Sequence, residues 1–299
     1  MSVRVGIDIG GTQLRVAALD EKSHILRRES FSNDHNVGPR ENLGRLADAI
    51  VGWGLEYEGI GIGCPGPLDF AGGQILNPPN LPGWEGFPVA EFFRERCGHR
   101  CVLNNDANVA GLAEARVGVG RGFASVVYMT VSTGVGAAYV ADGQIVGGAH
   151  SLATEVFNMI VCDAPSARLG MNPGALEDQS SGMAIARMAS QRMGRDVAAP
   201  EVFALADGGD ADALAVLEHA AECLARGVSN INAVVDPDVF VFGGSVALKN
   251  PGFMDLVFQK AKRYVLDPDS LLFREATCGE DAGQGGNQGG GTTGGELEG

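Results

Sequence analysis

The stretch Val5–Leu19, VGIDIGGTQLRVAAL, decides the fold of this chain. Two apolar runs of strand character flank Asp8 and the turn Gly10-Gly11-Thr12. A tight turn alone explains the glycines. A phosphate site explains the whole pattern, because glycines let backbone N–H groups approach phosphate oxygens and the threonine adds a hydroxyl donor. The stretch by itself leaves both interpretations open.

Length and composition favour a globular protein with room for two domains. The chain has 299 residues, 45% of them hydrophobic, and a formal net charge of −15. This acidic charge argues against non-specific binding to nucleic acid or to an acidic membrane, since both need basic surface. A small anionic ligand can still bind through backbone N–H groups.

Neither a targeting segment nor a membrane span is predicted. The N-terminus enters strand-like sequence almost at once, and no apolar run is long enough to cross a bilayer. The six cysteines are scattered and form no C-x-x-C pair, which favours reduced thiols in a cytoplasmic protein over a disulfide framework. They are Cys64, Cys97, Cys101, Cys162, Cys223 and Cys278.

The order of elements predicts two α/β halves built on one plan. Each half opens with a strand, a Gly-containing turn and a second strand, and continues with alternating helices and strands. The first half has predicted strands at 4–9, 12–19, 24–30, 59–63 and 101–104, and helices at 41–54, 90–97 and 106–117. The second half has predicted strands at 124–131, 135–141, 144–146 and 239–242, and helices at 182–193, 210–235 and 253–264.

Domain boundaries follow from this plan. We expect an N-terminal domain over 1–118 and a C-terminal domain over 119–283, because the Gly-rich stretch 118–122 separates the halves. We also expect a flexible tail over 284–299, which is rich in glycine and almost free of apolar residues. A cleft between the two domains is the expected place for a ligand.

A second Gly-containing turn heads the second half. The segment Ser132-Thr133-Gly134-Val135-Gly136 repeats the arrangement of the first turn. Two such turns, each opening a domain, favour a clamp that holds a polyphosphate from both sides. Asp8 would repel a phosphate directly, so we expect it to hold Mg²⁺ through water.

Two further segments place polar residues or glycines at the ends of predicted strands. In NNDAN, at 104–108, one side chain is needed as a helix cap, and Asp106 is then a candidate to accept a proton from a substrate hydroxyl. Asn105 is a candidate to orient the same substrate. Gly243-Gly244 follows an apolar strand and either turns the chain or lets a flat purine lie against the backbone.

Together these motifs resemble the ROK family of sugar kinases and sugar-responsive repressors, within the actin-like/hexokinase ATPase superfamily. The matches run in family order from Val5 to about Gly283. They are DIGGT, CPGP, NPPNLPGW, NNDAN with Ala113-Glu114, STGVG, GGAH, ALE, VDP and VFGGSV. Their order and spacing, rather than any single motif, make the resemblance specific.

The resemblance implies an α/β fold of two RNase H-like domains that close on ATP and a hexose. It assigns the phosphates and Mg²⁺ to Asp8, Gly10, Gly11, Thr12, Thr133 and Gly134, and the adenosine to Gly243 and Gly244. It assigns the sugar to Gly66, Asn80, Asn105, Asp106, Glu155, Asn158 and Glu177. Asp106 is the implied general base for the 6-hydroxyl, and a homodimer is expected by family likeness alone.

Three departures from the family pattern concern the sugar side and the C-terminus. The family's E-x-G-H segment reads Glu155-Val156-Phe157-Asn158, and its zinc cysteines are replaced in the stretch 168–175, RLGMNPGA. Cys162 is one thiol and cannot close a tetrahedral site, so we predict no zinc site. Thr154 and Phe157 replace usual glycines of the family, and the polyglycine tail replaces its last apolar helix.

Three classes of function remain open. The leading one is an ATP-dependent hexokinase, most simply a glucokinase, with an N-acetylated hexosamine, fructose or another hexose as alternative substrates. A sugar-responsive repressor is disfavoured by the acidic charge and by the position of DIGGT within the first residues of the chain. A catalytically impaired sugar-binding or regulatory protein draws support from Phe157, Asn158 and the tail.

Overall fold

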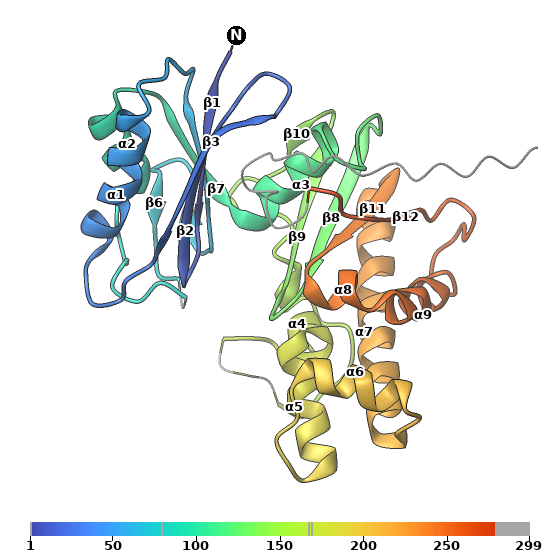
Figure 1. The fold of residues 1–299 in the computed structure, drawn as a ribbon. Helices are drawn as coiled ribbons and strands as arrows, with labels where there is room; N and C mark the ends of the chain where they lie inside the picture. The colour runs from blue at the N-terminus through green and yellow to red at the C-terminus, as the bar shows by residue number, and fades with distance from the viewer. Residues whose placement is uncertain (1, 79, 167, 169, 279–299) are drawn as a thin grey trace, which may run out of the picture.

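Two five-stranded sheets organise the chain in the computed structural model, which describes residues 2–78, 80–166, 168 and 170–278 (Figure 1). The first sheet has strand order β3-β2-β1-β4-β7 and the second has order β10-β9-β8-β11-β12. In each sheet an antiparallel meander of three strands adjoins two parallel strands. The two halves therefore share one plan, as predicted.

The first sheet contains the predicted meander and two later strands. Its strands are β1 Arg4–Ile9, β2 Gln13–Leu19, β3 Ile25–Ser32, β4 Ile60–Cys64 and β7 Cys101–Asn105. Along β1 the side chains alternate, so Val5, Ile7 and Ile9 are buried in one core while Asp8 points to the opposite face. The helices α1 Pro39–Gly52 and α2 Val89–Cys97 add their apolar residues to that core. Asp8 is therefore left on the face away from these helices.

Helix α3, Asp106–Arg116, lies between the two sheets (Figure 1). Its Ala110 packs with Tyr128 and Ala138 of the second sheet, and a Cβ on Gly111 would lie only 2.6 Å from the Ala138 side chain. This close packing joins α3 to the second sheet. We therefore propose a domain boundary before Asp106 in place of the one expected at 118.

After α3, the second half contains its own five-stranded sheet and six further α-helices in the described residues. Its strands are β8 Ser125–Val131, β9 Val135–Ala141, β10 Gln144–Ile145, β11 Val239–Gly243 and β12 Phe273–Glu275. Its helices are α4 Leu176–Ser180, α5 Gly182–Met193, α6 Ala199–Asp207, α7 Ala211–Val235, α8 Ser245–Lys249 and α9 Pro251–Ala261. The long helix α7 packs against α4, α5, α6 and α9 and forms the centre of the largest core.

Several elements differ from the prediction. The loop after β4 contains a hairpin of β5 Leu68–Asp69 and β6 Gln74–Ile75, and α4, α6, α8 and β12 add to the predicted elements. Helix α9 begins at Pro251, because a proline in the first turn needs no N–H partner, and it ends at Ala261. The expected tail and the end of the expected C-terminal domain, 279–299, lie outside the described residues. None of the helices in the described residues is both long enough and apolar enough to span a bilayer.

Candidate active site

Asp106 is the first residue of α3 and directly follows β7. Asn105 caps the helix, because its Oδ1 accepts a hydrogen bond from the backbone N–H of Ala107 at 2.9 Å. Asp106 Oδ1 accepts a bond from the same N–H at 2.8 Å. Since Asn105 already supplies the cap, the structure favours a role for the Asp106 carboxylate beyond capping.

Three carboxylates from different elements lie within electrostatic range of one another. The Asp106 side chain is accessible to solvent but crowded by protein atoms, and this desolvation raises its pKa. Desolvation and the charge of Asp106 raise the pKa of Glu155. Burial, followed by the charges of Asp106 and Asp8, raises the pKa of the Cys64 thiol. Asp8, Asp106 and Glu155 are therefore gathered around the end of β4.

The first predicted phosphate turn is closed by a hydrogen bond from Gly10 N to Gln13 O at 2.8 Å. Asn33, which is buried after β3, holds the turn from behind. Its Nδ2 donates to Gly10 O at 3.0 Å and its backbone N donates to Thr12 O at 2.9 Å. Asn33 is a positioning residue that the sequence analysis missed, because its partners lie more than 20 residues away.

The turn also contacts a predicted sugar residue. A Cβ on Gly11 would lie 3.0 Å from Asn80 O, so the loop that bears Asn80 lies directly against the first turn. Gly66 and Asn105 are neighbours as well, since a Cβ on Gly66 would lie 3.5 Å from Asn105 Nδ2. The structure thus brings Asn80 beside the first phosphate turn, and it brings two further predicted sugar residues, Gly66 and Asn105, beside each other.

Asp8 forms an ion pair with Arg15, its cross-strand neighbour on β2, with 3.2 Å between Arg15 Nη1 and Asp8 Oδ2. The sequence analysis assigns Asp8 to Mg²⁺. Such ions in phosphoryl-transfer sites bind one or two carboxylates together with substrate phosphates. Asp8 and Asp106 are carboxylates of this kind in one region, so the donor set fits a magnesium ion.

The second predicted phosphate turn adjoins the predicted adenosine residues. Ser132 N donates to Gly134 O at 2.9 Å, and Ser132 Oγ lies 3.0 Å from Ser245 Oγ at the start of α8. Gly244 has φ +86°, and a Cβ there would collide with Val131 O. Only glycine suits this position. The close approach brings the chain after β11 against the second turn.

Glu177, a predicted sugar residue, lies beside that second turn. Its Oε2 accepts a hydrogen bond from Val135 N at 2.9 Å, and a Cβ on Gly134 would lie 2.5 Å from the same oxygen. One carboxylate oxygen of Glu177 therefore holds the turn in place. The sugar contact of Glu177 stays a prediction.

Asn158 is the last residue of the short helix η1, Val156–Asn158. Its Oδ1 accepts a hydrogen bond from Asn172 N at 2.6 Å, and its backbone oxygen accepts one from Asn172 Nδ2 at 3.1 Å. The side-chain oxygen thus stabilises the loop, which leaves the Nδ2 group as the donor for the predicted sugar contact.

Comparison with known proteins places this site in a family. The model of the ROK family matches residues 4–288. The chain belongs to the ROK family. It is 30% identical to a glucokinase of Halalkalibacterium halodurans, over 93% of this chain and 92% of that protein. It is also 30% identical to an N-acetylmannosamine kinase of Yersinia pestis, over 88% of this chain and 89% of that protein.

A solved structure extends the likeness to the fold. A ROK hexokinase from Thermus thermophilus has a TM-score of 0.88 and 32% identity to this chain, covering 94% of this chain and 95% of that one. The predicted resemblance is confirmed, and with it the actin-like/hexokinase fold of two α/β halves. The chain is an ATP-dependent sugar kinase of the ROK family.

Two predictions from the sequence concern zinc ligands in this ROK kinase, one on the family's zinc positions and one on Cys162. The resemblance aligns Asn158 and the stretch 168–175 with the family's zinc ligands, and the prediction that the chain has no zinc site stays a prediction. The interpretation of Cys162 as an isolated thiol is wrong. Helix α7 brings His219 and Cys223 to it, and the ligand atoms of the three lie within 4.8 Å of one another.

Proposed function

We propose that this ROK kinase transfers the γ-phosphoryl group of ATP to the 6-hydroxyl of a hexose, with glucose as the leading substrate. The observation on which the proposal rests most is the environment of Asp106. Its carboxylate is solvent-accessible, is not required as the helix cap, and has a pKa raised by desolvation. A raised pKa suits a general base that must take up a hydroxyl proton near neutral pH.

The surrounding residues suit phosphoryl transfer, because positioning of the reactants and neutralisation of phosphate charge account for most of the catalysis in such reactions. Asp106 accepts the proton of the 6-hydroxyl, and Asn105 orients the sugar. The N–H groups of the first and second turns hold the phosphates, with Asn33 and Glu177 fixing the two turns from behind. Asp8 would hold Mg²⁺ through water, and the ion would supply positive charge to neutralise the phosphates.

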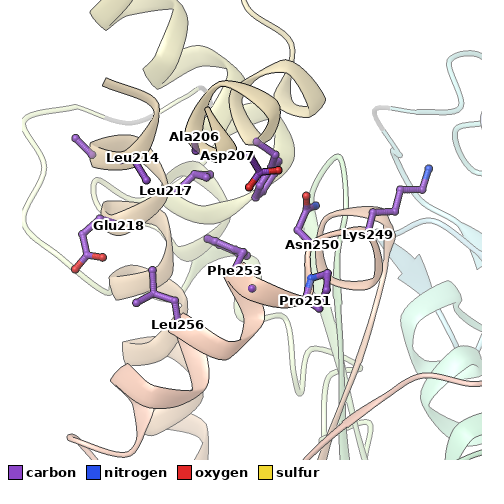
Figure 2. Close-up of a pocket in the computed structure, with 13 residues that line it drawn as sticks. Ala206, Asp207, Leu214, Leu217, Glu218, Lys249, Asn250, Pro251, Phe253 and Leu256 are labelled. Carbon is purple, nitrogen blue, oxygen red and sulfur yellow. The ribbon is translucent and has the colours of Figure 1, made fainter. Parts of the chain in front are cut away.

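The nucleoside end of ATP has a candidate place in a cavity of about 690 Å³ bounded by α6, α7, α8 and α9 (Figure 2). Helix α8 leads from Gly244 to Lys249 at the cavity, a rise of roughly 7 Å. The wall combines apolar Leu217 and Phe253 with polar Asp207 and Asn250, as ligand pockets commonly do. We place the purine there.

A panel of sugars with Mg-ATP tests the proposal. Glucose, mannose, fructose, N-acetylmannosamine and N-acetylglucosamine are each incubated with the enzyme, ADP release is measured, and the phosphorylated position is read by NMR. We expect the largest kcat/KM with glucose and the phosphate at the 6-position. Release of ADP with none of these sugars would refute the kinase.

A matched pair of variants tests the role of Asp106. Asp106→Asn should lower kcat/KM by about 10²–10⁴-fold, because the general base is lost. Asp196→Asn, at an exposed position before α6, should keep the activity of the unmodified enzyme. Equal activity of the two variants would exclude Asp106 as the base.

A kinase for an N-acetylated hexosamine is the second candidate. It is favoured by the Yersinia pestis relative, which has the same 30% identity to this chain as the glucokinase relative, over a somewhat shorter match. The altered segment Phe157-Asn158 lies at the predicted sugar site and is a further reason to include the acetylated sugars. A higher kcat/KM for an N-acetylated sugar than for glucose selects this alternative, and sugar binding without turnover selects a regulatory protein.

A further inference from the structure

Cys162, His219 and Cys223 form a compact cluster of potential metal ligands outside the proposed active site. His219 and Cys223 are four residues apart on α7, so both project from the same side of the helix. Cys162 comes from the loop that follows η1. The three ligand atoms lie within 4.8 Å of one another, and Cys223 Sγ is 3.6 Å from His219 Nε2.

The spacing of these atoms fits one tetrahedral ion. With Zn–S bonds of about 2.3 Å and Zn–N bonds of about 2.0–2.1 Å, neighbouring ligand atoms around zinc are separated by roughly 3.5–3.8 Å. The sulfur-to-nitrogen distance of 3.6 Å falls in this range. Two thiols and an imidazole are also the ligand types that zinc prefers over magnesium or calcium.

A fourth donor, an oxygen, lies within hydrogen-bond distance of the cluster. Gln179, a buried residue of α4, has its Oε1 atom 2.9 Å from His219 Nε2. The amide oxygen therefore lies beside the ligand atom of the imidazole and can occupy the remaining position of the tetrahedron. Since His219 is exposed, an ion can reach the cluster from solvent without unfolding of the core.

We propose that Cys162, His219 and Cys223 bind one zinc ion, with Gln179 as the fourth donor. None of these residues occupies the family's zinc positions, which here are Asn158 and the stretch 168–175. The ion joins α7 to the loop after η1 and so supports the predicted sugar residues on either side of that loop.

The contacts around the cluster show what the ion would add. Arg226 Nη1 donates to Val161 O at 3.3 Å, and Asn230 Nδ2 lies 3.7 Å from Met159 Sδ. Both contacts are long, and both come from exposed residues of α7. A metal bond from Cys162 to the same helix is shorter and stronger, so it fixes the loop more firmly than these contacts do.

Metal titration of the reduced, chelator-treated enzyme tests the proposal without any measurement of turnover. Zn²⁺ is titrated against a chromophoric chelator, and Co²⁺ is used as a spectroscopic probe. We expect one ion per chain, a thiolate-to-cobalt charge-transfer band, and the visible bands of tetrahedral cobalt. Failure of the proposed kinase activity would leave these readouts unchanged.

Variants identify the ligands. Cys162→Ser, Cys223→Ser and His219→Ala should each weaken zinc binding by more than about 100-fold, because loss of a ligand exceeds the effect of losing an outer-shell partner. Cys97→Ser, at another half-buried free thiol, is the matched control and should keep full affinity. Because His219 is exposed, its replacement should leave the core intact. His219→Ala therefore tests whether the cluster binds zinc even if Cys223→Ser unfolds.

Three results would overturn the zinc site. They are the absence of stoichiometric binding in the unmodified chain, equal affinity in His219→Ala and Cys97→Ser, and the finding that Cys162 and Cys223 are joined by a disulfide in the purified enzyme. In the last case the pair is a redox couple rather than a metal site, and mass spectrometry without reductant detects it.

Discussion

At the scale of single residues, Asp106 determines the expected pH dependence of the reaction. Desolvation raises its pKa in the folded enzyme. A general base acts only when it is deprotonated, so activity is lost as the pH falls through this raised pKa. We predict an acid limb of kcat/KM above the ordinary aspartate range, measured with glucose and Mg-ATP. An acid limb near pH 3.9, the ordinary value, would contradict this assignment.

The same raised pKa makes a prediction about stability. Ionised Asp106 is disfavoured in the fold relative to the unfolded chain, and this unfavourable contribution is present above the folded pKa and disappears below the unfolded pKa. Asp106→Asn cannot ionise, so it should raise the free energy of unfolding at neutral pH, with the gain fading toward low pH. Urea unfolding at several pH values measures the difference. An equal gain at all pH values would mean that the charge is not the cause.

Thr154 carries backbone strain beside Glu155. Its φ is +66°, a left-handed conformation that is unfavourable for a β-branched residue. Thr154→Gly should raise the free energy of unfolding by about 0.5–1 kcal/mol, because the relief of strain, roughly 1–2 kcal/mol, exceeds the entropic cost of glycine, roughly 0.5–1 kcal/mol. Thermal unfolding checks this. Thr154→Ala is the control. Its β-carbon keeps most of the backbone strain, so its free energy of unfolding should rise less than that of Thr154→Gly.

At the scale of elements, Glu114 fastens α3 to the segment after β12. The side chain is fully buried, and its Oε1 accepts hydrogen bonds from Thr277 N and Cys278 N, both at 2.7 Å. Its Oε2 accepts one from Val119 N at 3.1 Å. The contact joins residues more than 160 positions apart, so it stabilises the long-range packing of the second half.

Removal of this carboxylate should destabilise the whole fold. Glu114→Ala leaves three backbone N–H groups without their acceptor, that of buried Cys278 among them, and we predict a loss of roughly 3 kcal/mol in the free energy of unfolding. Glu114→Gln keeps one acceptor oxygen and should lose less. Urea unfolding of both variants is compared with Glu95→Ala, an exposed position on α2 that should change little. A loss below 1 kcal/mol in Glu114→Ala would mean that other contacts hold the segment.

The elements with strong local patterns could be predicted from the sequence. Strand β9 and helix α5 have the bounds that the apolar spacing and the flanking glycines indicate. Strand β12 could not be predicted, because three residues carry no periodic signal and its order comes from parallel pairing with β11. Helix α6 is short, and its early proline reads as part of a loop.

The same distinction applies to the candidate site. The turns at Gly10 and Gly134 can be predicted from local sequence, since glycine and threonine follow a strand at both positions. Local sequence does not predict the roles of Asn33, Ser245 or the pair His219 and Cys223. Their partners, which are Gly10, Ser132 and Cys162, come close only when distant segments of the chain fold together. Sequence motifs therefore identify the residues proposed to touch the ligands, and the fold adds the residues that position them.

At the scale of the whole molecule, the predicted contacts of each ligand come from both halves. The predicted phosphate contacts come from the first turn in one half and the second turn in the other. The predicted sugar contacts likewise combine Asn80 and Asn105 of the first half with Asp106 and Glu155 of the second, and the pKa of Glu155 responds to the charge of Asp106. A ligand that touches both halves favours the arrangement in which they are close, and this arrangement also suits the second ligand.

We therefore predict positive coupling between sugar and nucleotide binding. Calorimetric titration with glucose should give a dissociation constant about 5–150-fold lower in the presence of a non-hydrolysable ATP analogue, equivalent to about 1–3 kcal/mol. By reciprocity, glucose should tighten analogue binding by the same factor. AMP is the control, because it lacks the β- and γ-phosphates that we expect to connect the two turns, and it should leave glucose affinity nearly unchanged. If AMP and the analogue have equal effects, the coupling arises from the nucleoside alone and not from the two halves closing on the phosphates.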